Sequence, residues 1–116
     1  MTHRLLLHFA GPGTGPWPDL AAAARIARNA RTELPDAAIE VVVQGPCVAQ
    51  LAAGPQLNAD LAALAAEGDI EVSACRNSMR SAGVEEAALA PGVRPVPAAV
   101  AHLANGQFAG AAYVRI

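Results

Sequence analysis

The strongest constraint on the fold is an alternation along the chain between short apolar runs and segments with helical periodicity. Three runs are rich in Leu, Val and Ile and are bounded by turn-forming or charged residues, as expected for buried strands: residues 4–9, 38–43 and 69–74. Strands that alternate with helices imply right-handed crossovers and a parallel sheet with helices on both faces. The sequence therefore predicts an α/β fold.

The remaining segments fit the same alternation. Helical patterns cover residues 18–34, 45–54, 58–67, 75–83, 84–89 and 97–107, and weaker strands cover 92–96 and 111–116. Asn58 is a plausible helix cap, and prolines confine the strand at 92–96 to a sheet edge. With no repeat or linker in the pattern, we expect one domain over residues 1–116.

Composition excludes several classes of function. The formal net charge of −2 gives no basic surface for nucleic acid, and all eight basic residues are arginine. No apolar run reaches the roughly 18 residues that a membrane span needs, and the N-terminal apolar run is short for a signal peptide. We therefore expect a cytoplasmic protein that binds neither nucleic acid nor membrane, with free thiols.

In parallel sheets, functional residues lie in the loops that follow the carboxyl ends of the strands. We therefore expect the site among residues 9–17, 44–47, 74–80 and 96–98. Gly11, Gly13 and Gly15 form a glycine-rich loop after the first strand. Pro16 occupies the third glycine position of a dinucleotide fingerprint, and no G-K-[ST] follows. The pattern favours a loop that borders the site, with Trp17 packing over it, rather than a nucleotide-binding loop.

Cys75 is the candidate reactive residue, in the stretch ACRNSMRSAG (74–83). At a junction of strand and helix, free backbone N–H groups favour an anion such as a thiolate. Arg76 and Arg80 would add to this effect if their side chains turned toward the sulfur, and Asn77 and Ser78 offer hydrogen bonds. The alternative is a buried structural cysteine beside two solvated arginines, because cysteine is often fully buried.

Cys47 and the histidines carry weaker signals. Cys47 follows the second strand in GPCV, where it would pair with Cys75, resolve a modified Cys75, or simply be a small residue at a helix start. His8 ends the first strand and points either into the core or to the rim. Nothing in the spacing of His8, Cys47 and Cys75 supports a metal site.

The chain resembles the DsrE/DsrF-like family of small α/β proteins, which includes sulfur-relay subunits of the Tus and Dsr systems. Three stretches carry the resemblance: IEVVVQGPCVAQLAAG (39–54), GDIEVSACRNSMRSAGV (68–84) and GVRPVPAAVAHLANGQFAGAAYVRI (92–116). Their order and spacing match the family pattern over nearly the whole chain.

The resemblance implies a three-layer α/β/α fold with a doubly wound five-stranded parallel sheet, and assembly into homo-trimers or hexamers. It also implies that Cys75 carries a persulfide to an acceptor protein, without a cofactor or metal. Gln44 stands where many relatives have histidine, and Cys47 where glycine or alanine is usual, so no family role carries over to either. The candidate binding residues around Cys75 are Arg76, Asn77, Arg80, Gly11, Gly13, Gln44 and Cys47.

Three hypotheses follow for the function. In the first, Cys75 accepts sulfur from a donor and passes it to an acceptor protein, as in sulfur relay. In the second, the protein is a non-enzymatic module that binds a small anion or a nucleotide-like ligand. In the third, it is a structural subunit of an oligomeric assembly with no chemistry of its own.

Overall fold

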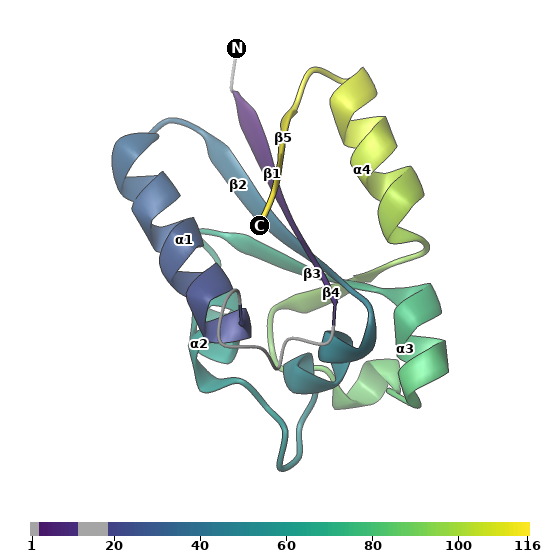
Figure 1. Ribbon diagram of the computed structural model, residues 1–116. Helices are drawn as coiled ribbons and strands as arrows, with labels where there is room; N and C mark the ends of the chain where they lie inside the picture. The colour runs from purple at the N-terminus through teal and green to yellow at the C-terminus, as the bar shows by residue number, and fades with distance from the viewer. Residues whose placement is uncertain (1–2, 12–18) are drawn as a thin grey trace.

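A five-stranded parallel sheet forms the centre of the computed structural model, which describes residues 3–11 and 19–116 (Figure 1). Its strands are β1 (Arg4–Ala10), β2 (Ala38–Gln44), β3 (Glu71–Cys75), β4 (Val93–Val96) and β5 (Ala112–Arg115). Their order is β4-β3-β2-β1-β5, and every neighbouring pair is parallel. The predicted α/β fold is confirmed, with β4 at an edge as its prolines require.

Within the described residues, the connections between strands hold four α-helices and two short 3-10 helices: α1 (Leu20–Glu33), η1 (Pro46–Leu51), α2 (Ala59–Glu67), α3 (Arg76–Ala82), η2 (Glu86–Ala88) and α4 (Ala99–Phe108). Asp19 caps α1 by accepting a 2.7 Å hydrogen bond from the Ala22 N–H. Asn58 caps α2 in the same way, as predicted. The first helix thus begins after its aspartate; Pro18, expected in its first turn, lies outside the described residues.

The short helix predicted over residues 45–54 is present as η1, but it is shorter than predicted and does not extend to Gly54. The structure has a 3-10 helix that ends at Leu51, because the chain then pairs with the segment around η2. The Ala53 N–H donates to the Ala88 carbonyl at 2.7 Å, and the Ala90 N–H donates to the Leu51 carbonyl at 2.9 Å. These backbone groups are satisfied outside a helix, so the helix stops.

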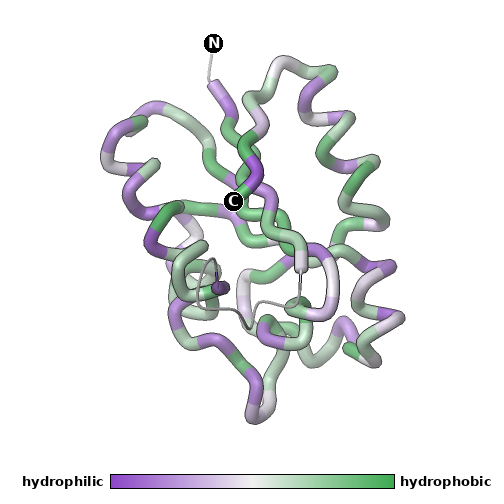
Figure 2. Tube along the Cα trace, in the orientation of Figure 1, coloured by the Kyte–Doolittle hydropathy of each residue, from purple (hydrophilic) through white to green (hydrophobic). Residues whose placement is uncertain are grey.

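Each face of the sheet has its own core. Helices α1 and α2 cover one face with η1, and α4 covers the other, which confirms the predicted three layers (Figure 1). The alternation of side chains along β2 shows the division: Val41 and Val43 join the larger core, while Val42 joins the smaller one beneath α4. Green and purple alternate along α1 and α4 in Figure 2, as amphipathic helices require.

The face beneath α4 is the more polar of the two. On β1 this face carries Arg4, Leu6 and His8. On β2 it carries Glu40 and Val42, and on β3 it carries Ser73 and Cys75. Gly106 allows α4 to approach β1, because a Cβ there would lie 2.6 Å from the Leu6 Cδ1. Within the described residues, no helix is both long and apolar enough to span a membrane.

Candidate functional site

Cys75 is the last residue of β3 and the N-cap of α3, beneath the first turn of α4. It is buried, with 2% of its surface exposed, and shares the smaller core with Leu6, Val42, Ala99 and Leu103. The Ala99 backbone N–H donates a hydrogen bond of 3.4 Å to the Cys75 Sγ. The sulfur therefore lies where the amino ends of α3 and α4 meet, a surrounding that favours negative charge.

This surrounding lowers the pKa of the Cys75 thiol. Burial is the largest single effect and raises the pKa, but hydrogen bonding from the Ser78 side chain, the Ser78 backbone and two further backbone groups together outweighs it. Backbone N–H groups of Ala99 and Asn77 act in the same direction. The net pKa lies below the ordinary cysteine value, as for thiols that react as thiolates.

The two arginines beside Cys75 have other partners. Arg76 Nε lies 2.5 Å from the Glu86 Oε1, and Arg80 donates to the side-chain oxygen of Asn77. Arg76 and Arg80 were expected to stabilise the Cys75 thiolate only if their side chains turned toward the sulfur. In the structure, hydrogen bonds rather than guanidinium groups lower the pKa of Cys75.

Cys47 lies in a different environment from Cys75. It is 1% exposed and belongs to the larger core on the opposite face of the sheet. Its thiol donates to the Gln44 carbonyl at 3.2 Å, and burial raises its pKa to about 11. Both cysteines are free. Of the three interpretations of Cys47, this geometry favours a small core residue near a helix start.

Gly11, the first glycine of the glycine-rich loop, borders the carboxyl end of β2. The Gly11 N–H donates to the Gln44 carbonyl, and the Gly11 carbonyl accepts from the Cys47 N–H, both at 3.3 Å. These bonds join the ends of β1 and β2. Gly13 and Trp17 lie outside the described residues.

Gln44 takes part in a chain of hydrogen bonds across the sheet. Its side-chain oxygen lies 2.8 Å from the His8 Nε2, and the His8 Nδ1 lies 2.7 Å from the Tyr113 hydroxyl. His8 is buried, so it faces the core beneath α4 rather than the rim. Sequence analysis did not identify Tyr113 as a site residue. It lies beside His8 because β5 pairs with β1, and the spacing of residues along the chain does not reveal that pairing.

A second polar cluster, also missed from the sequence, lies beneath α4. The Glu40 carboxylate is 2% exposed and accepts hydrogen bonds from Ser73 at 2.5 Å, from His102 at 2.7 Å and from Arg4. Burial raises the pKa of Glu40, but the bonds from Ser73, His102 and Arg4 together lower it below its usual range. The one available signal was a single charge inside the apolar strand AIEVVV.

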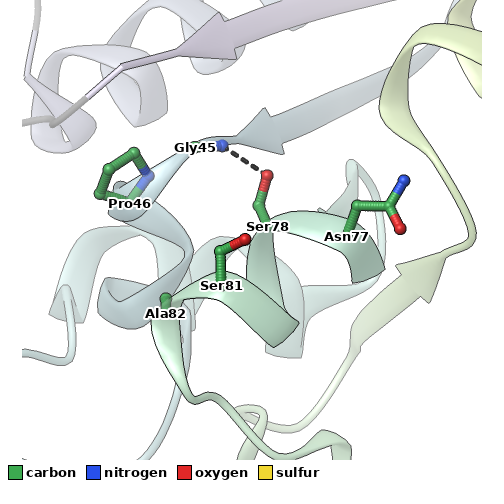
Figure 3. A pocket seen from close by; sticks show the side chains of 6 residues that line it. All are labelled: Gly45, Pro46, Asn77, Ser78, Ser81 and Ala82. Atoms are coloured by element: carbon green, nitrogen blue, oxygen red, sulfur yellow. Dashed lines mark hydrogen bonds between the residues drawn. The ribbon is translucent and has the colours of Figure 1, made fainter.

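A pocket of about 310 Å³ lies between η1 and α3, lined by Gly45, Pro46, Asn77, Ser78, Ser81 and Ala82 (Figure 3). Ser78 Oγ accepts a 2.8 Å hydrogen bond from the Gly45 N–H at its inner wall. Among the described residues, no group of three or more His, Cys, Asp or Glu could hold a metal ion.

Comparisons with known proteins agree with this architecture. The model of the DsrE/DsrF-like family matches residues 17–116. A solved structure of a protein of unknown function from Methanobacterium thermoautotrophicum, MTH1491, superposes with a TM-score of 0.84 at 25% identity, covering 98% of this chain and 99% of that one. The ychN protein from E. coli superposes with a TM-score of 0.77 at 15% identity over the full length of both chains.

No curated protein sequence shows significant similarity to this chain. The family match spans far more than half of the sequence and includes β2, β3 and the whole surrounding of Cys75. The two solved structures share the fold over nearly their entire length. The chain belongs to the DsrE/DsrF-like family.

Proposed function

We propose that this protein is a sulfur carrier of a sulfur-relay system, with Cys75 as the residue that holds the sulfur. The observation that carries the proposal is the convergence of hydrogen-bond donors on the Cys75 sulfur, which lowers its pKa. Membership in a family generally linked to sulfur relay supports the same interpretation. The chain acts as a single domain over residues 1–116.

The chemistry is a pair of sulfur transfers without net oxidation. In the first step, the Cys75 thiolate attacks the terminal sulfur of a donor persulfide; a new S–S bond forms at Cys75, the donor S–S bond breaks, and the donor leaves as a thiolate. In the second step, an acceptor thiolate attacks the terminal sulfur on Cys75, which leaves as a thiolate. A low pKa favours both steps at neutral pH, since it populates the attacking thiolate and improves the leaving group. No cofactor or metal is required.

We propose that Gln44 and Asn77 are binding residues for the sulfur that Cys75 holds. Asn77 supplies a backbone N–H, and Gln44 ends the strand beside β3 with its side chain on the Cys75 face. Arg76 and Arg80 lie on α3, where their charge serves a partner protein rather than the sulfur itself. Gly11 borders the approach to this end of the sheet.

The proposed setting is a cytoplasmic homo-oligomer, a trimer or hexamer, that meets a donor and an acceptor protein. Two large apolar side chains of α4 support an interface there: Val100 is 67% exposed and Phe108 is 85% exposed. Burial of such side chains against another chain is favourable.

The test is sulfur loading of the purified protein with inorganic polysulfide, read by mass spectrometry of the intact chain. We expect one added sulfur on the wild type and on Cys47→Ser, and none on Cys75→Ser. Full loading of Cys75→Ser with its fold intact would refute the proposal.

A second candidate function, a small-molecule binding module, is favoured by the pocket beside Ser78. A ligand of this site would raise the melting temperature, and the rise would persist in Cys75→Ser because Cys75 does not line the pocket. Thermal shifts with inorganic anions and nucleotides distinguish this function from sulfur relay.

A further inference from the structure

The first turn of α4 covers the sulfur of Cys75. Ala99 is 1% exposed and Cys75 is 2% exposed, and the two are joined through the Ala99 N–H and the Cys75 Sγ. An acceptor thiol on another protein must come within bonding distance of a sulfur attached to Cys75. It cannot do so while this turn remains in place, so transfer to a protein requires α4 to move.

The apolar contacts that hold α4 are made largely by small side chains. Its buried residues are Ala99, Leu103 and Gly106, and they pack against a small cluster that contains Leu6 and Val42. Small side chains bury little area, so the hydrophobic contribution that holds α4 is modest. The larger core lies entirely on the other face of the sheet and does not hold this helix.

A hydrogen bond between His102 and the buried Glu40 ties α4 to the sheet. His102 Nε2 lies 2.7 Å from the Glu40 Oε2, and the Glu40 side chain is 2% exposed. His102 follows Ala99 by one helical turn, so both lie on the face of α4 that meets the sheet. The contact with Glu40 and the contact with the sulfur are thus made by the same short piece of helix.

The other partners of Glu40 allow this tie to open. Arg4 belongs to β1 and Ser73 to β3, so both stay with the sheet when α4 moves. A buried charge left without any partner is strongly destabilising, but Glu40 keeps two of its three partners. Separation of His102 from Glu40 is therefore far less costly than the loss of an isolated buried pair.

We propose that His102 and Glu40 are positioning residues for Cys75. They hold the first turn of α4 over the sulfur, and their separation exposes the sulfur to the thiol of a partner protein. The role in transfer rests on the proposed function; the control of access to Cys75 does not.

The test measures the rate at which iodoacetamide alkylates Cys75 in the full chain, on the plateau of the pH profile where the thiol is fully ionised. His102→Ala removes the tie, and we expect alkylation about tenfold faster, which corresponds to about 1.4 kcal/mol. The pH profile itself should shift to a higher apparent pKa, because the Ala99 N–H no longer bonds the sulfur. His102→Gln, which retains a side-chain donor, should stay within about twofold of the wild type.

Asn105→Ala is the matched control, since Asn105 lies on α4 one turn after His102 but is exposed. Cys47 is the internal control in every sample, because it is buried in the other core. Faster alkylation of Cys75 with Cys47 unchanged supports displacement of α4. Equal rates for His102→Ala and the wild type would overturn the proposal, as would parallel acceleration at Cys47, which indicates general loosening.

Glu40→Gln provides a second variant that approaches the same contact from the sheet. Glutamine has one acceptor oxygen for the three donors that now share two, so the variant should accelerate alkylation of Cys75 as His102→Ala does. An unchanged rate would count against the proposal even if His102→Ala does not fold. Loading of the wild type with polysulfide is measured separately. If the wild type takes up no sulfur, the sulfur-carrier function fails, whereas the alkylation rates still decide the role of His102 and Glu40.

Discussion

Cys47 and Cys75 belong to opposite faces of one sheet, although each lies at the carboxyl end of a neighbouring strand. Cys47 packs in the core beneath α1 and α2, and Cys75 packs beneath α4. Burial raises the pKa of Cys47 to about 11, whereas hydrogen bonds lower the pKa of Cys75 despite its burial. The same sheet therefore carries one thiol with a raised pKa and one with a lowered pKa.

This contrast predicts two separate pH profiles of alkylation. Cys75 should react with an apparent pKa below the unperturbed value of about 8.5, because its thiolate is stabilised. Cys47 should stay unlabelled over the same range, because its pKa is raised to about 11. Iodoacetamide labelling with mass spectrometry of peptides measures both in one sample. A Cys75 that reacts only after unfolding would mean that it is a packing residue.

A matched pair of variants at Ser78 tests whether its hydroxyl lowers the pKa of Cys75. Its Oγ accepts the Gly45 N–H at 2.8 Å, which leaves the hydroxyl hydrogen to donate, and its side chain lowers the pKa of Cys75. Ser78→Thr keeps the hydroxyl and should preserve the apparent pKa of Cys75. Ser78→Val has nearly the shape of threonine but no hydroxyl, so it should raise that pKa.

The pKa follows from the same alkylation profile, with Ser81→Ala as the control. Ser81 lies on the same helix and lines the same pocket, but it is exposed. Equal profiles for Ser78→Thr and Ser78→Val would show that the hydroxyl does not act on the sulfur.

Glu40 predicts a pH dependence of stability. Its pKa in the folded protein is lowered below that of the unfolded chain, about 4.3, so its ionised form favours folding. This contribution is complete above the unfolded pKa and is lost as the pH falls through the folded pKa. The charged and titratable side chains that face it are Arg4 and His102, with Ser73 as the third partner.

Glu40→Gln should therefore lower the free energy of unfolding at neutral pH by roughly 1–3 kcal/mol, and its stability should fall less on acidification. Urea denaturation between neutral and acidic pH measures both effects. Glu67→Gln is the control, since its exposed pair with Arg28 should contribute little to stability. A Glu40→Gln variant that loses stability in acid as steeply as the wild type would contradict the assignment.

The fold could be predicted because its signals are local. Strands β1, β2 and β3 are apolar runs, Asn58 caps its helix, and Pro95 marks the edge strand β4. The short helix predicted over 45–54 ends at Leu51 instead of Gly54, because a distant segment, around Ala88, takes the hydrogen bonds that would have continued it. Such long-range pairing leaves no mark in local periodicity.

The site could be predicted only in part, for the same reason. The position of Cys75 at a junction of strand and helix was visible, but the Ala99 N–H that bonds its sulfur comes from another element. Arg76 was a reasonable candidate by proximity in sequence, yet Glu86 takes its guanidinium. The cluster around Glu40 joins residues of β1, β2, β3 and α4, and only the three-dimensional arrangement brings them together.

The backbone conformation of Gly45 leads to a prediction about the turn that follows β2. Its backbone has a φ of +91° and a ψ of −169°, a conformation that residues other than glycine rarely adopt. A Cβ at Gly45 would also lie 3.1 Å from the Gly11 nitrogen and 3.2 Å from the Gly11 oxygen, which are backbone atoms with little freedom to move. Gly45→Ala should therefore destabilise the fold by roughly 1–3 kcal/mol from strain alone.

Gly54→Ala separates the strain from the contact with Gly11. Gly54 also has a positive φ, +137°, but a Cβ there would meet nothing within 4 Å. We expect Gly45→Ala to lose more stability in urea denaturation than Gly54→Ala, and to raise the apparent pKa of Cys75, because the displaced Gly45 N–H no longer orients Ser78. If Gly54→Ala were the more destabilised variant and the profile of Cys75 were unchanged in Gly45→Ala, the turn at Gly45 would be independent of the site.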